Sequence, residues 1–181
     1  TCIAPDYVLA HRSIRGELVK RIGQAIREFY GEDPKRSPDL ARIVNDRHFD
    51  RLTRLLDPDK VQLGGQTDPA ERYIAPTVMT DVSLDDPVMS EEIFGPILPV
   101  IEFDSLSDAL DIVEHRPNPL ALYLFTSNPA DEQLVIDRVS FGGGCINNTL
   151  VHFLDPKLPF GGIGPSGLGA YHGQYGFEAF S

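Results

Sequence analysis

The chain has 181 residues, 41% of them hydrophobic, which is enough for one sizeable core. We therefore expect a single folded unit over residues 1–181. The formal net charge is -11, with 16 basic against 27 acidic residues, so a nucleic-acid backbone would be repelled. This composition argues against a nucleic-acid partner.

The sequence contains no sign of a membrane span or an export signal. No stretch approaches the roughly 18 consecutive apolar residues that a spanning helix needs, and no charged segment precedes an apolar one at the start. Cys2 and Cys145 are too few for a disulfide scaffold, which indicates a reducing compartment. We expect a cytoplasmic protein, although an anchor on a segment beyond Ser181 stays open.

The chain starts at Thr1, without a methionine and without a polar segment that would open a domain. We therefore expect a piece of a longer protein, whose chemistry also depends on residues outside it.

Four segments have apolar residues at three- and four-residue spacing, which is typical of amphipathic helices. In the first of them Ser13 is placed to cap the start and Gly31 to end the helix. The predicted helices are Ser13–Tyr30, Asp46–Leu56, Ser105–His115 and Ala130–Val139. Short apolar runs lie between them, at Lys60–Leu63, Ile97–Phe103, Leu120–Thr126 and Gly144–Asn147. This alternation predicts an α/β layered domain with a largely parallel sheet flanked by helices.

Two segments rich in proline or glycine interrupt the alternation, Asp85–Pro99 and Leu158–Gly176. Loops of this kind are often functional or hold an interface, and an ordinary connecting loop is an equally good reading for either one alone.

Cys2 is the candidate nucleophile because of its neighbours. A lone cysteine is more often a buried structural thiol, so the surrounding residues must decide. The run Thr1-Cys2-Ile3-Ala4-Pro5-Asp6-Tyr7 resembles the nucleophile segment of the aldehyde dehydrogenases, especially their class 3 branch. Further segments that resemble this branch follow in the same order: Phe29–Asp33, Arg42–Val44, Arg47–Phe49, Arg72–Thr77, Glu91–Pro96, Pro119–Tyr123 and Leu158–Gly162. The resemblance covers essentially the whole chain, which is under half of a complete member.

The resemblance implies that Cys2 attacks an aldehyde in an NAD(P)-dependent oxidation to a carboxylic acid. A thiolate adds to the carbonyl to give a thiohemiacetal, which loses hydride to the nicotinamide and becomes a thioester that water opens. The Cys2 backbone N–H would hold the oxyanion together with an upstream asparagine, and an upstream glutamate would activate the water. A Rossmann-like coenzyme domain also precedes Thr1 in such enzymes. We therefore expect residues 1–181 to be a C-terminal piece of the catalytic region, inactive or nearly so alone, from a parent that is a homodimer.

The segment Glu91–Pro96 supplies the candidate coenzyme residues. Without the resemblance, the better interpretation of two successive glutamates is a pair of solvated carboxylates in the first turn of a helix. The resemblance implies instead that Glu92 accepts hydrogen bonds from both hydroxyls of the nicotinamide ribose. Phe94 would offer an apolar face to the nicotinamide ring of NAD or NADP.

The glycines between Gly162 and Gly167 satisfy the G-x-G-x-x-G spacing, but we do not predict a dinucleotide fingerprint there. That motif needs a preceding strand and a following helix, whereas prolines precede and interrupt this one. The resemblance implies a loop at the substrate end of the site. Phe160 is a candidate wall residue, with Tyr171 and His172 at the entrance, and plain packing is at least as good a reading for all three.

Two other hypotheses stay open. One is a Cys–His hydrolase, because any of the 5 histidines could in principle serve Cys2 as a base. The other is a non-catalytic structural or oligomerising piece. The spacing of cysteines and histidines offers no zinc site, and Cys145 is predicted to be a buried structural thiol.

Overall fold

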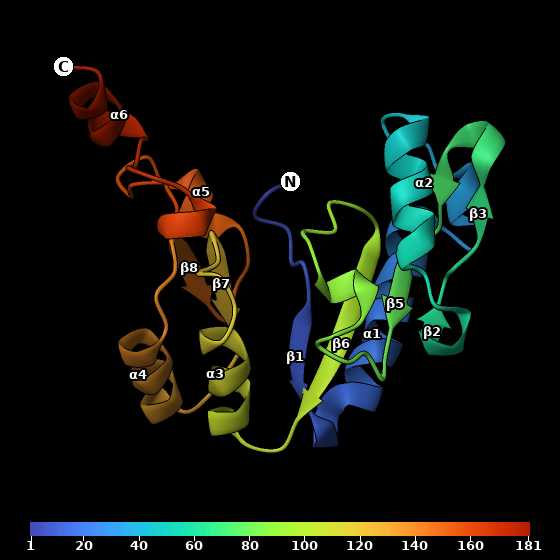
Figure 1. Cartoon of the computed structure of the whole chain (residues 1–181), viewed down its shortest axis with the longest axis horizontal. Coiled ribbons are helices and arrows are strands. Elements are labelled where there is room, and N and C mark those ends of the chain that lie inside the picture. Colours follow the sequence, from blue (N-terminus) through green and yellow to red (C-terminus); the bar gives the residue numbers. More distant parts are fainter. The chain divides into compact units, whose positions relative to one another are not determined.

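The computed structural model describes all residues, Thr1 to Ser181, and divides into two compact units (Figure 1). Pro5–Asp104 forms one, here called the four-stranded unit, and Thr1–Ala4 with Ser105–Ser181 forms the other, called the C-terminal unit. Composition favoured a single folded unit, but each part has a hydrophobic cluster of its own, around Val100 in the first and Leu110 in the second. Thr1–Ala4 thus packs with Ser105–Ser181 rather than with the residues that follow it directly.

The four-stranded unit is built on a sheet with β6 in an interior position. The strand order is β1 (Val8–His11), β6 (Ile97–Phe103), β5 (Thr77–Met79) and β2 (Val61–Leu63). β1 and β5 both run parallel to β6, and β2 pairs antiparallel with β5. A separate antiparallel pair joins β3 (Thr67–Asp68) to β4 (Tyr73–Ile74). The predicted α/β architecture with a largely parallel sheet is therefore confirmed.

Helix α1 (Arg12–Tyr30) covers the core of this unit with the apolar face that its spacing predicted. Its partly buried residues Leu18, Val19 and Ile22 pack against a cluster that contains Val100. Gly31 ends the helix with φ 79°, and its N–H donates to the Arg27 carbonyl. The predicted cap was wrong. His11 is the N-cap, and its imidazole accepts from the Ser13 N–H, because β1 runs directly into the helix.

The other three predicted helices begin and end within one residue of their predicted limits, as α2 (Asp46–Leu55), α3 (Leu106–Glu114) and α4 (Pro129–Arg138). Ser105 caps α3 through a reciprocal capping box with Asp108. Periodicity did not predict strands β1, β3, β4 and β5. The short helices and 3-10 turns that it did not predict are α5 (Val151–Leu154), α6 (Gly173–Ala179), η1 (Pro34–Arg36), η2 (Pro58–Lys60), η3 (Pro69–Glu71), η4 (Pro87–Met89) and η5 (Gly164–Ser166). None of the helices combines the length and the apolar character that crossing a membrane requires.

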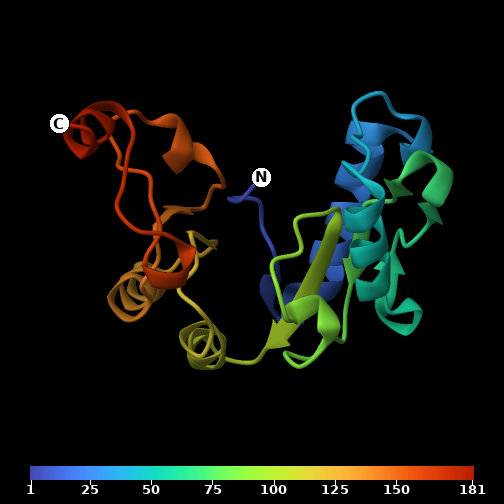
Figure 2. The ribbon, with the colours of Figure 1, turned by 45° about the horizontal axis from the view of Figure 1, so that its top comes forward.

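The C-terminal unit contains a two-stranded parallel ribbon, β7 (Ala121–Leu124) and β8 (Gly143–Ile146). Leu122 and Leu124 pack on α3 and α4, which lie side by side (Figures 1 and 2). Arg138 of α4 also forms ion pairs with acidic residues of α3. Since side chains alternate along a strand, Tyr123 of β7 and its neighbour Cys145 of β8 belong to the opposite face.

Val100 tests the assignment of the sheet core. Its side chain is 0% exposed in β6, so Val100→Ala should lower the free energy of unfolding by about 2 kcal/mol through lost burial and a small cavity. Val44 is 77% exposed and provides the matched control, Val44→Ala, which should change stability very little. Urea unfolding of both variants gives the comparison. Equal losses in the two variants would contradict the core assignment.

Candidate functional site

Cys2 lies on an exposed turn whose backbone is tied down. The Ala4 N–H donates to the Thr1 carbonyl at 3.1 Å and closes the turn around Cys2 and Ile3. Ile3 is only 6% exposed, while the Cys2 side chain is open to solvent. The Tyr123 hydroxyl donates to the Ile3 carbonyl at 2.7 Å. A buried neighbour and a strand residue thus hold the turn while its thiol stays accessible to a reactant.

Cys145 and His152 form a contact on the same face of the ribbon as Tyr123. The Cys145 Sγ lies 3.4 Å from His152 Nδ1, and the rings of His152 and Tyr123 are 5.8 Å apart between centroids. A Cβ on Gly143 would lie 2.9 Å from His152 Cδ2, so the absence of a side chain there makes room for the imidazole. Cys145 was predicted to be a buried structural thiol. It is instead half-buried, and its sulfur contacts the His152 imidazole.

Burial shifts the pKa values of His152 and Tyr123 in opposite directions. Desolvation lowers the pKa of His152, so its imidazole is neutral near pH 7 and has one nitrogen that accepts a hydrogen bond. Burial also raises the pKa of Tyr123, which keeps the hydroxyl protonated and able to donate to Ile3. His152 Nε2 is buried without a partner. Within the C-terminal unit no histidine is hydrogen-bonded to Cys2, which disfavours the Cys–His hydrolase.

The segment with the candidate coenzyme residues is a loop whose main chain is clamped from two sides. Arg51 of α2 donates to the Glu91 carboxylate at 2.9 Å and to the Glu92 carbonyl at 3.2 Å. On the other side the Ile93 N–H donates to the Asp6 carboxylate at 2.9 Å, and the Ile93 side chain is buried. The segment is therefore not the first turn of a helix, since side chains rather than helical hydrogen bonds hold its backbone.

The clamps leave Glu92 and Phe94 pointing outward on either side of buried Ile93. Glu92 is exposed, and no hydrogen bond or ion pair engages its carboxylate. Phe94 is 61% exposed at φ +50°, a left-handed conformation that costs a non-glycine residue about 1 kcal/mol or more and often marks a functional segment. The structure thus brings these two predicted residues together in one loop of the four-stranded unit.

Phe160, Tyr171 and His172 also come together, within the C-terminal unit. Phe160 and Tyr171 form an antiparallel bridge through two backbone hydrogen bonds of 2.7 and 2.9 Å, and the rings of Phe160 and His172 are stacked at 5.6 Å. Phe160 is buried in this aromatic cluster, whereas Tyr171 is exposed. The buried Phe160 ring is placed to support its aromatic neighbours, whereas the Tyr171 ring is accessible to solvent.

The glycines between Gly162 and Gly167 lie on a loop that includes η5, with neither a strand before them nor a long helix after them. They therefore lack the strand, turn and helix that dinucleotide recognition needs.

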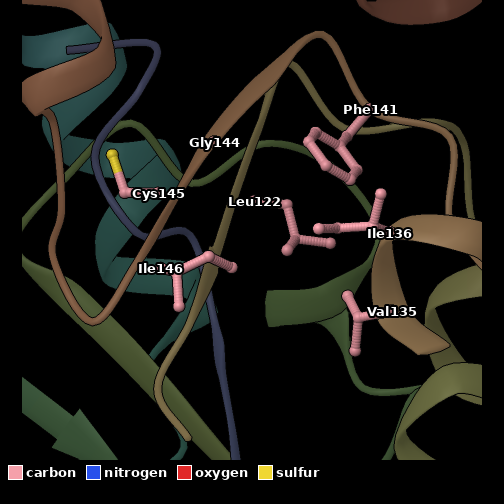
Figure 3. A pocket seen from close by; sticks show the side chains of 7 residues that line it. All are labelled: Leu122, Val135, Ile136, Phe141, Gly144, Cys145 and Ile146. Atoms are coloured by element: carbon pink, nitrogen blue, oxygen red, sulfur yellow. The ribbon is translucent and has the colours of Figure 1, made fainter. Parts of the chain in front are cut away.

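A hollow of about 130 Å³ lies beside the ribbon, lined by Leu122, Val135, Ile136, Phe141, Gly144, Cys145 and Ile146. Figure 3 shows Leu122, Ile136 and Phe141 grouped together, with the Cys145 sulfur pointing away from them. This volume is below the several hundred Å³ of typical ligand sites, so we interpret the hollow as loose packing on the apolar face of the ribbon.

Four residues that support these segments were not singled out as site residues from the sequence: Asp6, Arg51, Tyr123 and His152. Asp6 and Tyr123 lie in runs that carry the family resemblance, which was the available signal for them. Arg51 offered no local signal, because its partners lie 40 to 42 positions away. His152 lies only seven positions from its partner Cys145, but no sequence motif links the two residues.

Comparisons with known proteins assign the family. The model of the aldehyde dehydrogenase family matches residues 1–181. The 4,4'-diaponeurosporen-aldehyde dehydrogenase of Staphylococcus aureus is 49% identical over 183 residues, which cover 100% of this chain and 40% of that protein. The dimeric NADP-preferring aldehyde dehydrogenase of Mus musculus is 49% identical over 181 residues, again 100% of this chain and 40% of the relative.

The fold agrees with these relatives. The structure described as the substrate-bound state of Staphylococcus aureus AldH matches with a TM-score of 0.97 and 49% identity, covering 99% of this chain and 40% of that one. The chain therefore spans about 40% of the length of the curated relatives that it matches.

The two thiols should differ in reactivity. Cys2 is exposed, whereas Cys145 is half-buried against His152, so iodoacetamide at neutral pH should alkylate Cys2 several times faster. Peptide mass spectrometry over a time course measures both rates in one sample. Equal, slow alkylation would favour a structural role for Cys2.

His152 should make stability depend on pH. Its pKa is lowered in the folded state, while the unfolded imidazole titrates at about 6.5. The stability that neutral His152 contributes is therefore fully present above about pH 6.5 and is lost as the pH falls toward the folded value. His152→Asn should flatten this loss in unfolding experiments between about pH 7 and 5, and exposed His48→Asn serves as the control. An unchanged slope in His152→Asn would contradict the assignment.

Proposed function

Because this chain belongs to the aldehyde dehydrogenase family, we propose that the protein containing it oxidises aldehydes to carboxylic acids with NAD or NADP, using Cys2 as the nucleophile. The observation that carries the proposal is the exposed Cys2 thiol on a turn tied to Tyr123, in a chain that matches the family over its whole length. Since the chain spans about 40% of its relatives, residues 1–181 alone would be inactive or nearly so.

In the proposed reaction the Cys2 sulfur attacks the carbonyl carbon of the aldehyde, and a thiohemiacetal forms on Cys2. The backbone N–H of Cys2 donates to the oxygen as negative charge develops there. When bound, the coenzyme supplies a hydride acceptor. Loss of hydride leaves a thioester on Cys2, and water opens it to release the acid and restore the thiol.

Glu92 and Phe94 fit a nicotinamide riboside. The Glu92 carboxylate has no protein partner, so both oxygens are free to accept from two ribose hydroxyls. The Phe94 ring is exposed and fixed at a left-handed backbone position, which suits it to limit where the nicotinamide lies. The clamps from Arg51 and Asp6 on the main chain support this role by holding the loop in place.

The aldehyde-binding side of the site would use the aromatic cluster. We propose that Tyr171 and His172 border the entrance for the substrate and that Phe160 stands behind them as part of the wall. The exposure of Tyr171 and its backbone pairing with Phe160 support this arrangement. The Staphylococcus aureus relative is named for a diaponeurosporen-aldehyde, and an aromatic border suits an apolar aldehyde.

The compartment and the oligomeric state of the protein are also part of the proposal. We propose a cytoplasmic homodimer, in line with the word dimeric in the name of the mouse relative and with only two, unpaired cysteines. The same name supports NADP as one of the two coenzymes.

The decisive variant is Cys2→Ala in the intact protein. It should abolish aldehyde oxidation, because no other atom forms the thiohemiacetal, while coenzyme binding stays nearly unchanged. Steady-state NAD(P)H formation and coenzyme fluorescence titration measure the two properties, with Cys145→Ser as the matched thiol control, because serine keeps a hydrogen-bonding group beside His152 and should keep most of the activity. Retained oxidation in Cys2→Ala, or loss of both activity and coenzyme binding, would overturn the assigned role.

A further inference from the structure

We propose that Tyr123 is the positioning residue for the nucleophile, and that its hydroxyl fixes the turn that presents Cys2. The inference rests on the proposed role of Cys2 and extends it to a residue on a separate strand of the same unit.

The contact that carries the inference is the hydrogen bond from the Tyr123 hydroxyl to the Ile3 carbonyl, 2.7 Å long and spanning 120 positions of sequence. Ile3 directly follows Cys2, so this bond fixes the backbone next to the nucleophile. Within the C-terminal unit it is the only hydrogen bond that reaches Thr1–Ala4 from outside the turn, since the other one joins Ala4 to Thr1. Together with the buried Ile3 side chain, one phenolic hydroxyl therefore holds the turn in place.

Tyr123 is itself held rigidly. It lies in β7 directly across from Cys145 of β8, and its ring packs against His152 at 5.8 Å between centroids. His152 is in turn fixed by its contact with Cys145 and by the space that Gly143 leaves for it. A group on a regular strand with packed neighbours positions a reactive loop better than another loop would.

Removing the hydroxyl should affect alignment rather than thiol chemistry. The Ile3 carbonyl loses its donor and the turn gains freedom, while the Cys2 sulfur stays exposed and chemically unchanged. Hydride loss from the thiohemiacetal needs a defined geometry, so small displacements of the sulfur reduce the rate. Alkylation by a small reagent has no such requirement. The two rates should separate in a variant that lacks only this hydroxyl.

The experiment compares Tyr123→Phe with Tyr73→Phe in the intact protein. Tyr73 is buried in the four-stranded unit, whereas Tyr123 is half-buried, so the Tyr73 variant controls for the loss of a tyrosine hydroxyl shielded from solvent elsewhere in the chain. We expect Tyr123→Phe to lower kcat for aldehyde oxidation about fivefold, the effect of one lost hydrogen bond, with the coenzyme KM unchanged. Iodoacetamide should alkylate Cys2 within about twofold of the original rate, and Tyr73→Phe should match the original protein in both assays.

Each outcome decides the inference. An unchanged kcat in Tyr123→Phe would exclude a positioning role, and a parallel fall in the alkylation of Cys2 would assign Tyr123 to thiol activation instead. Faster alkylation of Cys145 together with Cys2 would mean that the hydroxyl only stabilises the ribbon. Failure of the proposed function is separate, because it would appear as activity retained in Cys2→Ala whatever Tyr123→Phe does.

Discussion

The conformation of the turn that carries Cys2 depends on the hydrogen bond from the Tyr123 hydroxyl to the Ile3 carbonyl. It joins the Thr1–Ala4 segment to a ribbon formed by residues far along the sequence. Burial raises the pKa of Tyr123, so the donor persists through neutral and alkaline pH. The exposed Cys2 owes its fixed backbone to this contact and to the buried side chain of Ile3.

The loop at Glu92 in the other unit follows the same physical principle with different atoms. Arg51 and Asp6 bind main-chain groups of Glu92 and Ile93, so the loop is ordered without engaging the side chains of Glu92 or Phe94. Main-chain clamps of this kind satisfy backbone polar groups that a loop would otherwise leave to water. In both units side chains thus hold the backbone of a functional segment while its reactive or binding groups remain free.

Sequence patterns predicted the parts of the fold that local spacing encodes. The apolar periodicity of α1 and α3 is a local property, and both helices form where expected. Strand β1 was missed because its four residues run directly into α1 with no turn between them. The bond between Asp6 and Ile93 spans 87 positions, and that between Tyr123 and Ile3 spans 120, so no local pattern contains them. Only the family resemblance pointed to Cys2, Glu92 and Phe94.

The side chains that hold the two functional segments also restrict which residues can stand at two neighbouring glycines, Gly95 and Gly143. A Cβ on Gly95 would come within 2.6 Å of the Leu52 side chain, and one on Gly143 within 2.9 Å of His152. Both neighbours belong to the supports, since Leu52 is buried in α2 next to Arg51 and His152 packs on Tyr123. A side chain at either glycine would displace the support before it reached the functional residue. The space left at these two positions is therefore as much a part of the candidate site as the hydrogen bonds that hold it.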